Sequence, residues 1–132
     1  QNIVPSLDTN ILLRIILLDN EVQLAKVKRL LKKHNEFAVS DQTIVEVVYS
    51  IGGYYEYTRE EVAGAIQRLM DNQHINMNRA LFERVLPNYI EHTGVSFTDC
   101  CLEAHATLNK QTPLYTIDKK LANQLPHAEL IK

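Results

Sequence analysis

Short apolar segments alternate with helical patterns along this chain, and the alternation limits the possible folds more than any other feature. Five short strands are predicted at 3–7, 37–39, 75–77, 114–117 and 128–131. Helical patterns fall at 9–18, 21–34, 40–51, 58–71, 79–92, 96–108 and 119–123. Brief links from strand to helix indicate parallel strands joined by right-handed crossovers, with helices on both faces of the sheet. The sequence therefore predicts a three-layer α/β/α fold around a central, mainly parallel sheet of about four to five strands.

Several helix ends carry start and stop signals. Thr58 and Glu61 have the spacing of a capping box and predict the start of the fourth helix. Gly52 and Gly53 predict the end of the third helix. Pro87 predicts a kink or a restart within the fifth helix, because proline removes a backbone hydrogen bond.

Length and composition indicate one globular domain over residues 1–132. The 132 residues are 45% hydrophobic and 23% charged, which is ordinary for a single folded domain. The longest apolar run, 11–18, contains Arg14 and is far shorter than the ~20 residues of a membrane span, so we expect no membrane association. Cys100 and Cys101 are adjacent and unsuited to pairing with each other, which favours a reducing, cytoplasmic location.

Four acidic residues occupy positions from which carboxylates can converge. Asp8 follows the first predicted strand, and Asp118 follows the fourth. Asp99 lies in the first turn of the sixth predicted helix, and Glu46 lies about two turns into the third. Functional groups gather beyond the carboxyl ends of parallel strands, so all four can meet at one edge of the sheet. Clustered carboxylates repel one another unless a hard cation such as Mg²⁺ or Mn²⁺ neutralises them, so the pattern is typical of a divalent-metal phosphodiesterase.

Each acid also has a purely structural interpretation, which stays open at this point. Asp8 and Asp118 can be helix N-caps, and Asp99 can be the acidic member of a capping box with Ser96. Glu46 is flanked on both sides by Ile and Val, so we expect it to be buried, where an uncompensated carboxylate costs several kcal/mol. Its alternative is an exposed stripe on an otherwise apolar helix.

Four sequence blocks together resemble a PIN domain. They are Leu-Asp-Thr-Asn at 7–10, Thr-Ile-Val-Glu at 43–46, Phe-Thr-Asp-Cys at 97–100, and Leu-Tyr-Thr-Ile-Asp-Lys-Lys-Leu at 114–121. The chain is most similar to the VapC-type toxins of toxin–antitoxin pairs. A single block such as Asp-Thr-Asn is weak evidence, whereas four blocks in the expected order and spacing cover essentially the whole chain.

This resemblance implies a metal-dependent endoribonuclease that hydrolyses RNA phosphodiester bonds. By motif match, Mg²⁺ or Mn²⁺ would be held by the catalytic carboxylates of Asp8, Glu46, Asp99 and Asp118. A cation bound in this way lowers the pKa of a bound water and stabilises charge on the departing oxygen. Thr9 and Asn10 match the polar pair beside the first acid, and Thr116 matches a hydroxyl residue before the last, where such side chains orient carboxylates.

Substrate binding requires positive charge beside the acids. Lys119 and Lys120 adjoin the last acid, and Arg14 lies on the helix after the first, so these three are candidates for binding RNA. A longer basic run comprises Lys26, Lys28, Arg29, Lys32 and Lys33. This run could follow an RNA backbone, although a row of charges on a helix is more often a solvated face. The net charge of −2 argues against a protein that coats nucleic acid by bulk charge.

The resemblance also implies partners. A VapC-type toxin would cleave a structured RNA such as tRNA or rRNA, form homodimers, and be restrained by a VapB-type antitoxin whose C-terminal segment obstructs the acidic site. Two alternatives remain: a housekeeping RNA-processing nuclease with the same chemistry, and a catalytically idle PIN scaffold that binds RNA or protein.

Overall fold

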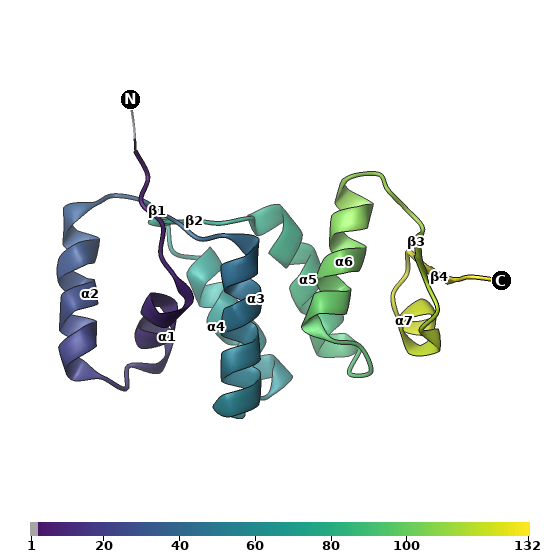
Figure 1. Cartoon of the computed structure of the whole chain (residues 1–132), viewed down its shortest axis with the longest axis horizontal. Helices are drawn as coiled ribbons and strands as arrows, with labels where there is room; N and C mark the ends of the chain where they lie inside the picture. Colours follow the sequence, from purple (N-terminus) through teal and green to yellow (C-terminus); the bar gives the residue numbers. More distant parts are fainter. Residues whose placement is uncertain (1–2) are drawn as a thin grey trace. The chain divides into compact units, whose positions relative to one another are not determined.

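A computed structural model of the protein describes residues 3–132, which fall into two compact units, 3–78 and 79–132. We call them the N-terminal and C-terminal units. Both combine helices with short parallel strands (Figure 1). Over the described residues, no helix has both the length and the apolar character needed to cross a membrane.

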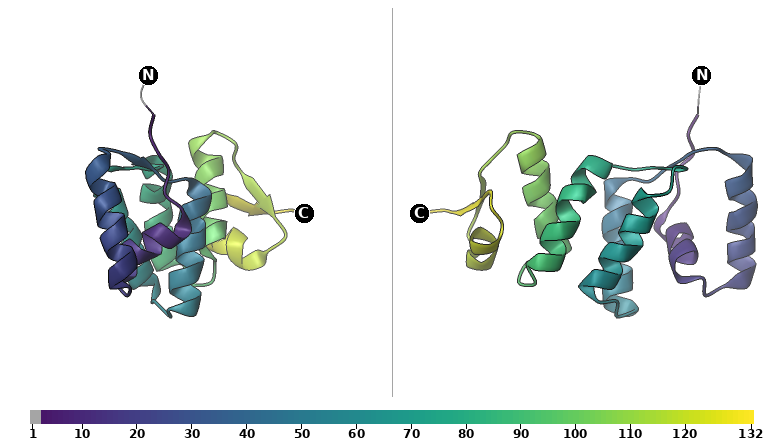
Figure 2. Two further views of the ribbon diagram at one scale, coloured as in Figure 1. Left: turned by 60° about the vertical axis from the view of Figure 1, so that its left-hand side comes forward. Right: turned by 180° about the vertical axis from the view of Figure 1, so that it is seen from behind.

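The N-terminal unit combines helices with one pair of short strands. Its elements are α1 (Thr9–Leu17), α2 (Glu21–Lys33), β1 (Phe37–Ala38), α3 (Asp41–Tyr49), the π-helix η1 (Ser50–Tyr54), α4 (Arg59–Met70) and β2 (Ile75–Asn76). β1 runs parallel to β2, with Phe37 opposite Ile75. Helix α1 contacts both α2 and α3, and the views in Figures 1 and 2 show α1 beside α2.

The predicted first strand is an extended segment joined to β1 by an isolated bridge. Ser6 pairs with Ala38 in parallel orientation. The Leu7 N–H donates to the Ala38 carbonyl at 3.0 Å, and the Ala38 N–H donates to the Pro5 carbonyl at 2.7 Å. Leu7 is buried, with 3% of its surface exposed, and fixes the point at which the chain enters α1.

The C-terminal unit is built on a helix pair and a second pair of parallel strands. Its elements are α5 (Arg79–Glu91), α6 (Phe97–Leu108), β3 (Leu114–Thr116), α7 (Lys119–Gln124) and β4 (Ala128–Leu130). β3 and β4 align from Leu114 opposite Ala128 to Thr116 opposite Leu130. Helices α5 and α6 pack through aromatic rings, with the Phe97 ring centroid 6.0 Å from Phe82 and 5.2 Å from Tyr89.

The α/β class and the parallel orientation of the strands are confirmed. A single central sheet of about four to five strands is not confirmed, because the four strands pair two by two within the separate units. The physical reason is the length of the ladders. The strands were predicted from the lengths of apolar segments. Within each of these segments, only two or three residues form the regular backbone hydrogen bonds that define a strand.

The helix stop predicted at Gly52 and Gly53 is wrong. Gly52 and Gly53 do not end the third helix, since the chain continues from α3 into η1, where the Tyr55 N–H donates to the Ser50 carbonyl at 3.2 Å. The turn comes later, at Glu56, which has a φ of 57°. Pro87 lies inside α5, which runs from Arg79 to Glu91 without a restart, so the kink stays a prediction. Pro87 is exposed, so water can satisfy the carbonyl that loses its N–H partner.

Candidate functional site

Asp8 lies where the bridged segment enters α1, and its side chain begins that helix. Its Oδ1 accepts a hydrogen bond from the Ile11 N–H at 3.0 Å, as expected of an N-cap. Asp8 is exposed, and among the described residues of its own unit Oδ2 accepts no hydrogen bond. One carboxylate oxygen therefore holds the helix, and the other is available to a ligand.

Glu46 is linked to the start of α1 by a hydrogen bond from Thr9. The Thr9 Oγ1 hydroxyl donates to Glu46 Oε1 at 3.1 Å. Thr9 follows Asp8 in the sequence, so this hydrogen bond connects the segment that carries Asp8 to Glu46. The prediction that Glu46 is buried is wrong, because it is exposed on α3. Ile44 and Val47 point to the core, whereas Glu46 and Tyr49 occupy the opposite, solvent-facing stripe.

Asp99 completes a capping box at the start of α6. The Asp99 N–H donates to Ser96 Oγ at 3.0 Å, and Asp99 Oδ2 accepts the Ser96 N–H at 3.2 Å. Asp99 is half-buried between the buried side chains of Phe97 and Cys100. The capping prediction is confirmed, and Oδ1 accepts no hydrogen bond from the described residues of its unit.

Asp118 starts α7 immediately after β3. Its Oδ1 accepts hydrogen bonds from the Lys120 N–H at 2.9 Å and the Leu121 N–H at 3.2 Å. Thr116 supports this turn, because its Oγ1 accepts the Asp118 N–H at 2.9 Å. Asp118 is exposed, and its Oδ2 has no donor among the described residues of its unit. Thr116 therefore fixes the backbone of the last acid.

The three basic residues suggested for RNA binding differ in their surroundings. Arg14 forms an ion pair with Asp19, with Nη1 3.4 Å from Oδ1, so its charge is already compensated. Lys119 and Lys120 are exposed in the first turn of α7, beside Asp118. Asn10 is exposed on α1 and lines a pocket with Asp8.

Glu103, which the sequence patterns did not single out, is the one described carboxylate that is fully buried. Glu103 on α6 has 0% of its surface exposed. The Arg84 guanidinium on α5 donates to both carboxylate oxygens, from Nε to Oε1 at 3.2 Å and from Nη2 to Oε2 at 3.1 Å. His127 adds its backbone N–H at 3.2 Å from Oε2. Leu102 and Ala104 flank Glu103 in the sequence, but a similar apolar setting surrounds the exposed Glu46, so this setting alone does not identify a buried acid.

The four acids divide evenly between the units. Over residues 3–132, neither unit by itself gathers three or more His, Cys, Asp or Glu side chains in an arrangement that could hold a metal ion. Asp8 and Glu46 belong to the N-terminal unit, and Asp99 and Asp118 belong to the C-terminal unit. Each acid nevertheless offers an oxygen ligand of the type that Mg²⁺ and Mn²⁺ prefer. The donor chemistry therefore fits such a cation.

Asp8 and Asp118 begin helices that directly follow extended segments of an α/β protein, which is where functional groups gather in such folds. The family model of the PIN domain matches residues 6–124, and the chain belongs to the PIN-domain family. Neither the curated proteins nor the solved structures contain a match to the chain. PIN domains are generally nucleases that act on RNA and use Mg²⁺ or Mn²⁺, so family membership supports nuclease activity.

Proposed function

We propose that this protein is an endoribonuclease that requires Mg²⁺ or Mn²⁺ and acts as one PIN domain over residues 1–132. The observation that carries the proposal is the family match over residues 6–124, which includes all four acids. The proposed metal ligands are Asp8, Glu46, Asp99 and Asp118. When bound, the cation would supply an activated water and stabilise the charge that develops on the phosphate oxygens.

The chain's own residues would hold the carboxylates in position. Asp8 and Asp118 each use one oxygen to cap a helix, which fixes the side-chain rotamer and leaves the second oxygen for the cation. Thr9 orients Glu46 through the hydroxyl contact at 3.1 Å. Thr116 positions Asp118 through its backbone N–H. No covalent protein nucleophile is required by this chemistry.

Thr9→Val is expected to lower the RNA cleavage rate about tenfold, since partners that orient metal-ligating carboxylates typically contribute about 10–100-fold. The substitution removes the hydroxyl that donates to Glu46 and keeps a β-branched side chain of similar volume. The rate should be measured on one RNA substrate over a Mn²⁺ titration. Thr9→Ser retains the donor and should recover most of the rate. An unchanged rate in Thr9→Val would remove Thr9 from the positioning role.

We further propose that the nuclease is the toxin of a VapBC-type pair and works as a homodimer. Support comes from the four motif blocks and from the negative charge of the acidic site, which a basic side chain of an antitoxin could neutralise. Expression of the chain alone should arrest growth, and co-expression of the cognate antitoxin should restore it. A complex in which no basic antitoxin side chain enters the acidic site would contradict this form of inhibition.

Incubation of the purified chain with total RNA tests the nuclease activity directly. Discrete cuts with 5′-phosphate ends are expected in Mg²⁺ or Mn²⁺ and should be absent with EDTA. Asp99→Asn serves as the inactive control. Sequencing of the cut ends would identify the substrate, whether tRNA, rRNA or another RNA. Absence of metal-dependent cleavage in every RNA pool would favour an idle PIN scaffold.

A further inference from the structure

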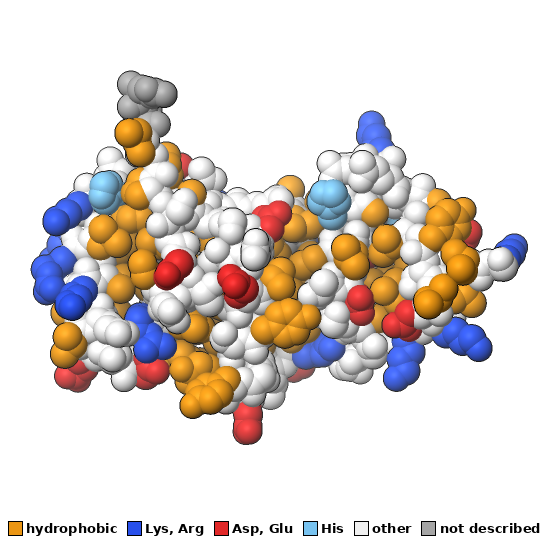
Figure 3. All heavy atoms as spheres, viewed as in Figure 1, with side chains coloured by type: hydrophobic (Ala, Val, Ile, Leu, Met, Phe, Trp, Pro, Cys, Tyr) orange, Lys and Arg blue, Asp and Glu red, His pale blue; other side chains and the backbone are white. Residues whose placement is uncertain are grey.

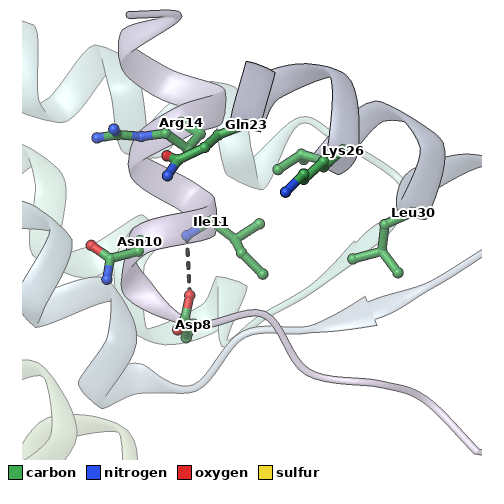
Figure 4. Close-up of a pocket in the computed structure, with 8 residues that line it drawn as sticks. Asp8, Asn10, Ile11, Arg14, Gln23, Lys26 and Leu30 are labelled. Carbon is green, nitrogen blue, oxygen red and sulfur yellow. Dashed lines mark hydrogen bonds between the residues drawn. The ribbon is translucent and has the colours of Figure 1, made fainter. Parts of the chain in front are cut away.

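A pocket lies between α1 and α2 and begins at Asp8. It is open to solvent, has a volume of about 310 Å³ and is lined by Asp8, Asn10, Ile11, Arg14, Gln23, Lys26, Val27 and Leu30. In Figure 4, Ile11 from α1 faces Lys26 and Leu30 from α2 across this space, with Asp8 at its lower end. The volume is at the lower limit of the ~300–1,000 Å³ typical of small-molecule sites, which suits a group the size of one nucleotide base.

The lining combines an apolar interior with a polar rim. Ile11, Val27 and Leu30 provide the apolar surface, and Val27 has only 6% of its surface exposed. Asn10 and Gln23 add side-chain amides, which both donate and accept hydrogen bonds. A nucleobase has apolar faces and a polar edge, so this combination matches a base better than it matches a purely charged or purely aliphatic ligand.

One side of α2 carries a row of positive charge that begins in the pocket. Successive helix residues are rotated by about 100°, so Lys26, Arg29 and Lys33 lie within about 60° of one another. The row spans about 10 Å along the helix. Lys26 lines the α1–α2 pocket, and Lys33 lines a second pocket with residues 3–5 and 34–36. Figure 3 shows Lys and Arg side chains gathered over the α2 edge of the N-terminal unit.

This charge is not neutralised within the described chain. Among residues 3–132, none of the Lys and Arg side chains of α2 forms an ion pair, and Glu21 is the one acid in the helix. Like charges at helical spacing repel one another, so the row is unfavourable until an anion compensates it. A polyanion that approaches Asp8 also needs cations beside the acid, since the net charge of the chain is −2.

We infer that the α1–α2 pocket and the row Lys26–Arg29–Lys33 form a binding path for single-stranded RNA. A base next to the cleaved phosphate would occupy the pocket, and the following phosphates would run along α2. The inference deepens the proposed nuclease function and takes its substrate class from it. Lys28 projects about 160° from Lys26 and lies outside the path, whereas Lys32 lies about 60° from Arg29 and borders it.

Two double variants with identical changes in charge test the path. Lys26→Glu with Lys33→Glu alters the row, and Lys28→Glu with Lys110→Glu makes the same change in charge at two exposed lysines outside the row. Affinity for a fluorescent single-stranded RNA of mixed sequence should be measured by anisotropy in EDTA, where cleavage does not occur. The row variant should bind at least tenfold more weakly. The steepness of log K plotted against log salt concentration should fall by about 1.4, which is about 0.7 for each of two lost phosphate contacts. The control should stay within about threefold of the unsubstituted protein.

A second comparison tests the pocket itself. The unsubstituted protein should bind RNA with abasic central positions several-fold more weakly than intact RNA, because an abasic position has no base to occupy the pocket. Leu30→Gln makes part of the apolar lining polar without a change in charge and should reduce this difference, while thermal unfolding confirms that the variant is folded. Equal losses in both double variants, or equal binding of abasic and intact RNA, would overturn the path. Because binding is measured without metal, absence of cleavage alone would contradict the nuclease proposal and leave the binding path standing.

Discussion

Replacement of Arg84 by Met should lower the free energy of unfolding by about 3–5 kcal/mol, because it removes the guanidinium that pairs with a buried carboxylate. Glu103 has no exposed surface, and Arg84 donates to both of its oxygens at 3.2 and 3.1 Å. Met fills much of the volume of the Arg side chain, so the loss would report on charge rather than on packing. Urea unfolding followed by circular dichroism gives the free energy directly.

Two companion variants identify the cause of that loss. Arg68→Met removes an exposed arginine from α4 and should change the unfolding free energy by no more than about 0.5 kcal/mol. Arg84→Met combined with Glu103→Leu replaces the ion pair by apolar side chains and should recover much of the stability. A cost below about 1 kcal/mol for Arg84→Met would show that Glu103 does not depend on this partner.

Asp8→Asn and Asp118→Asn should each reduce RNA cleavage by at least about 100-fold and leave the metal-free fold almost unchanged. The amide oxygen of Asn can accept the same cap hydrogen bonds that Asp8 accepts from Ile11 and that Asp118 accepts from Lys120. What the substitution removes is the negative charge that a divalent cation requires. The variants thus separate the capping role of each acid from its proposed catalytic role.

Thermal unfolding with and without Mn²⁺ supplies a measurement independent of cleavage. A ligand at about 100 times its Kd stabilises a folded protein by about 2.7 kcal/mol, so Mn²⁺ should raise the melting temperature of the unsubstituted protein. That increase should disappear in Asp8→Asn and Asp118→Asn. Asp71→Asn makes the same change in charge at the end of α4 and should preserve both cleavage and the Mn²⁺ effect. Full cleavage activity in Asp8→Asn would contradict a role for Asp8 as a metal ligand and leave only its role as a helix cap.

Structural features that depend on only three or four neighbouring residues, such as helix caps, were predictable from the sequence. The capping box of Thr58 and Glu61 is confirmed, with hydrogen bonds of 2.9 and 3.1 Å, as is the box of Ser96 and Asp99. Asp8 caps α1 as expected. These motifs need only local backbone geometry, so no knowledge of the tertiary fold was required.

Burial of the two glutamates was not predictable in the same way. Glu46 and Glu103 both lie among apolar neighbours on helices, yet Glu46 is exposed and Glu103 is fully buried. The difference depends on which side of each helix packs against the rest of its unit, and on whether an arginine such as Arg84 is in reach. Sequence spacing specifies neither, because both depend on contacts between distant segments. The short strand pairs escaped prediction for the same reason.

The shared use of Asp8 and Asp118 as caps and as proposed ligands constrains how this sequence can change over generations. A descendant that no longer needs catalysis still needs the starts of α1 and α7, where Asn and Ser cap almost as well as Asp. Inactive descendants should therefore carry Asn or Ser at positions 8 and 118 more often than Ala. Such residues would record a loss of activity in a lineage that kept its fold.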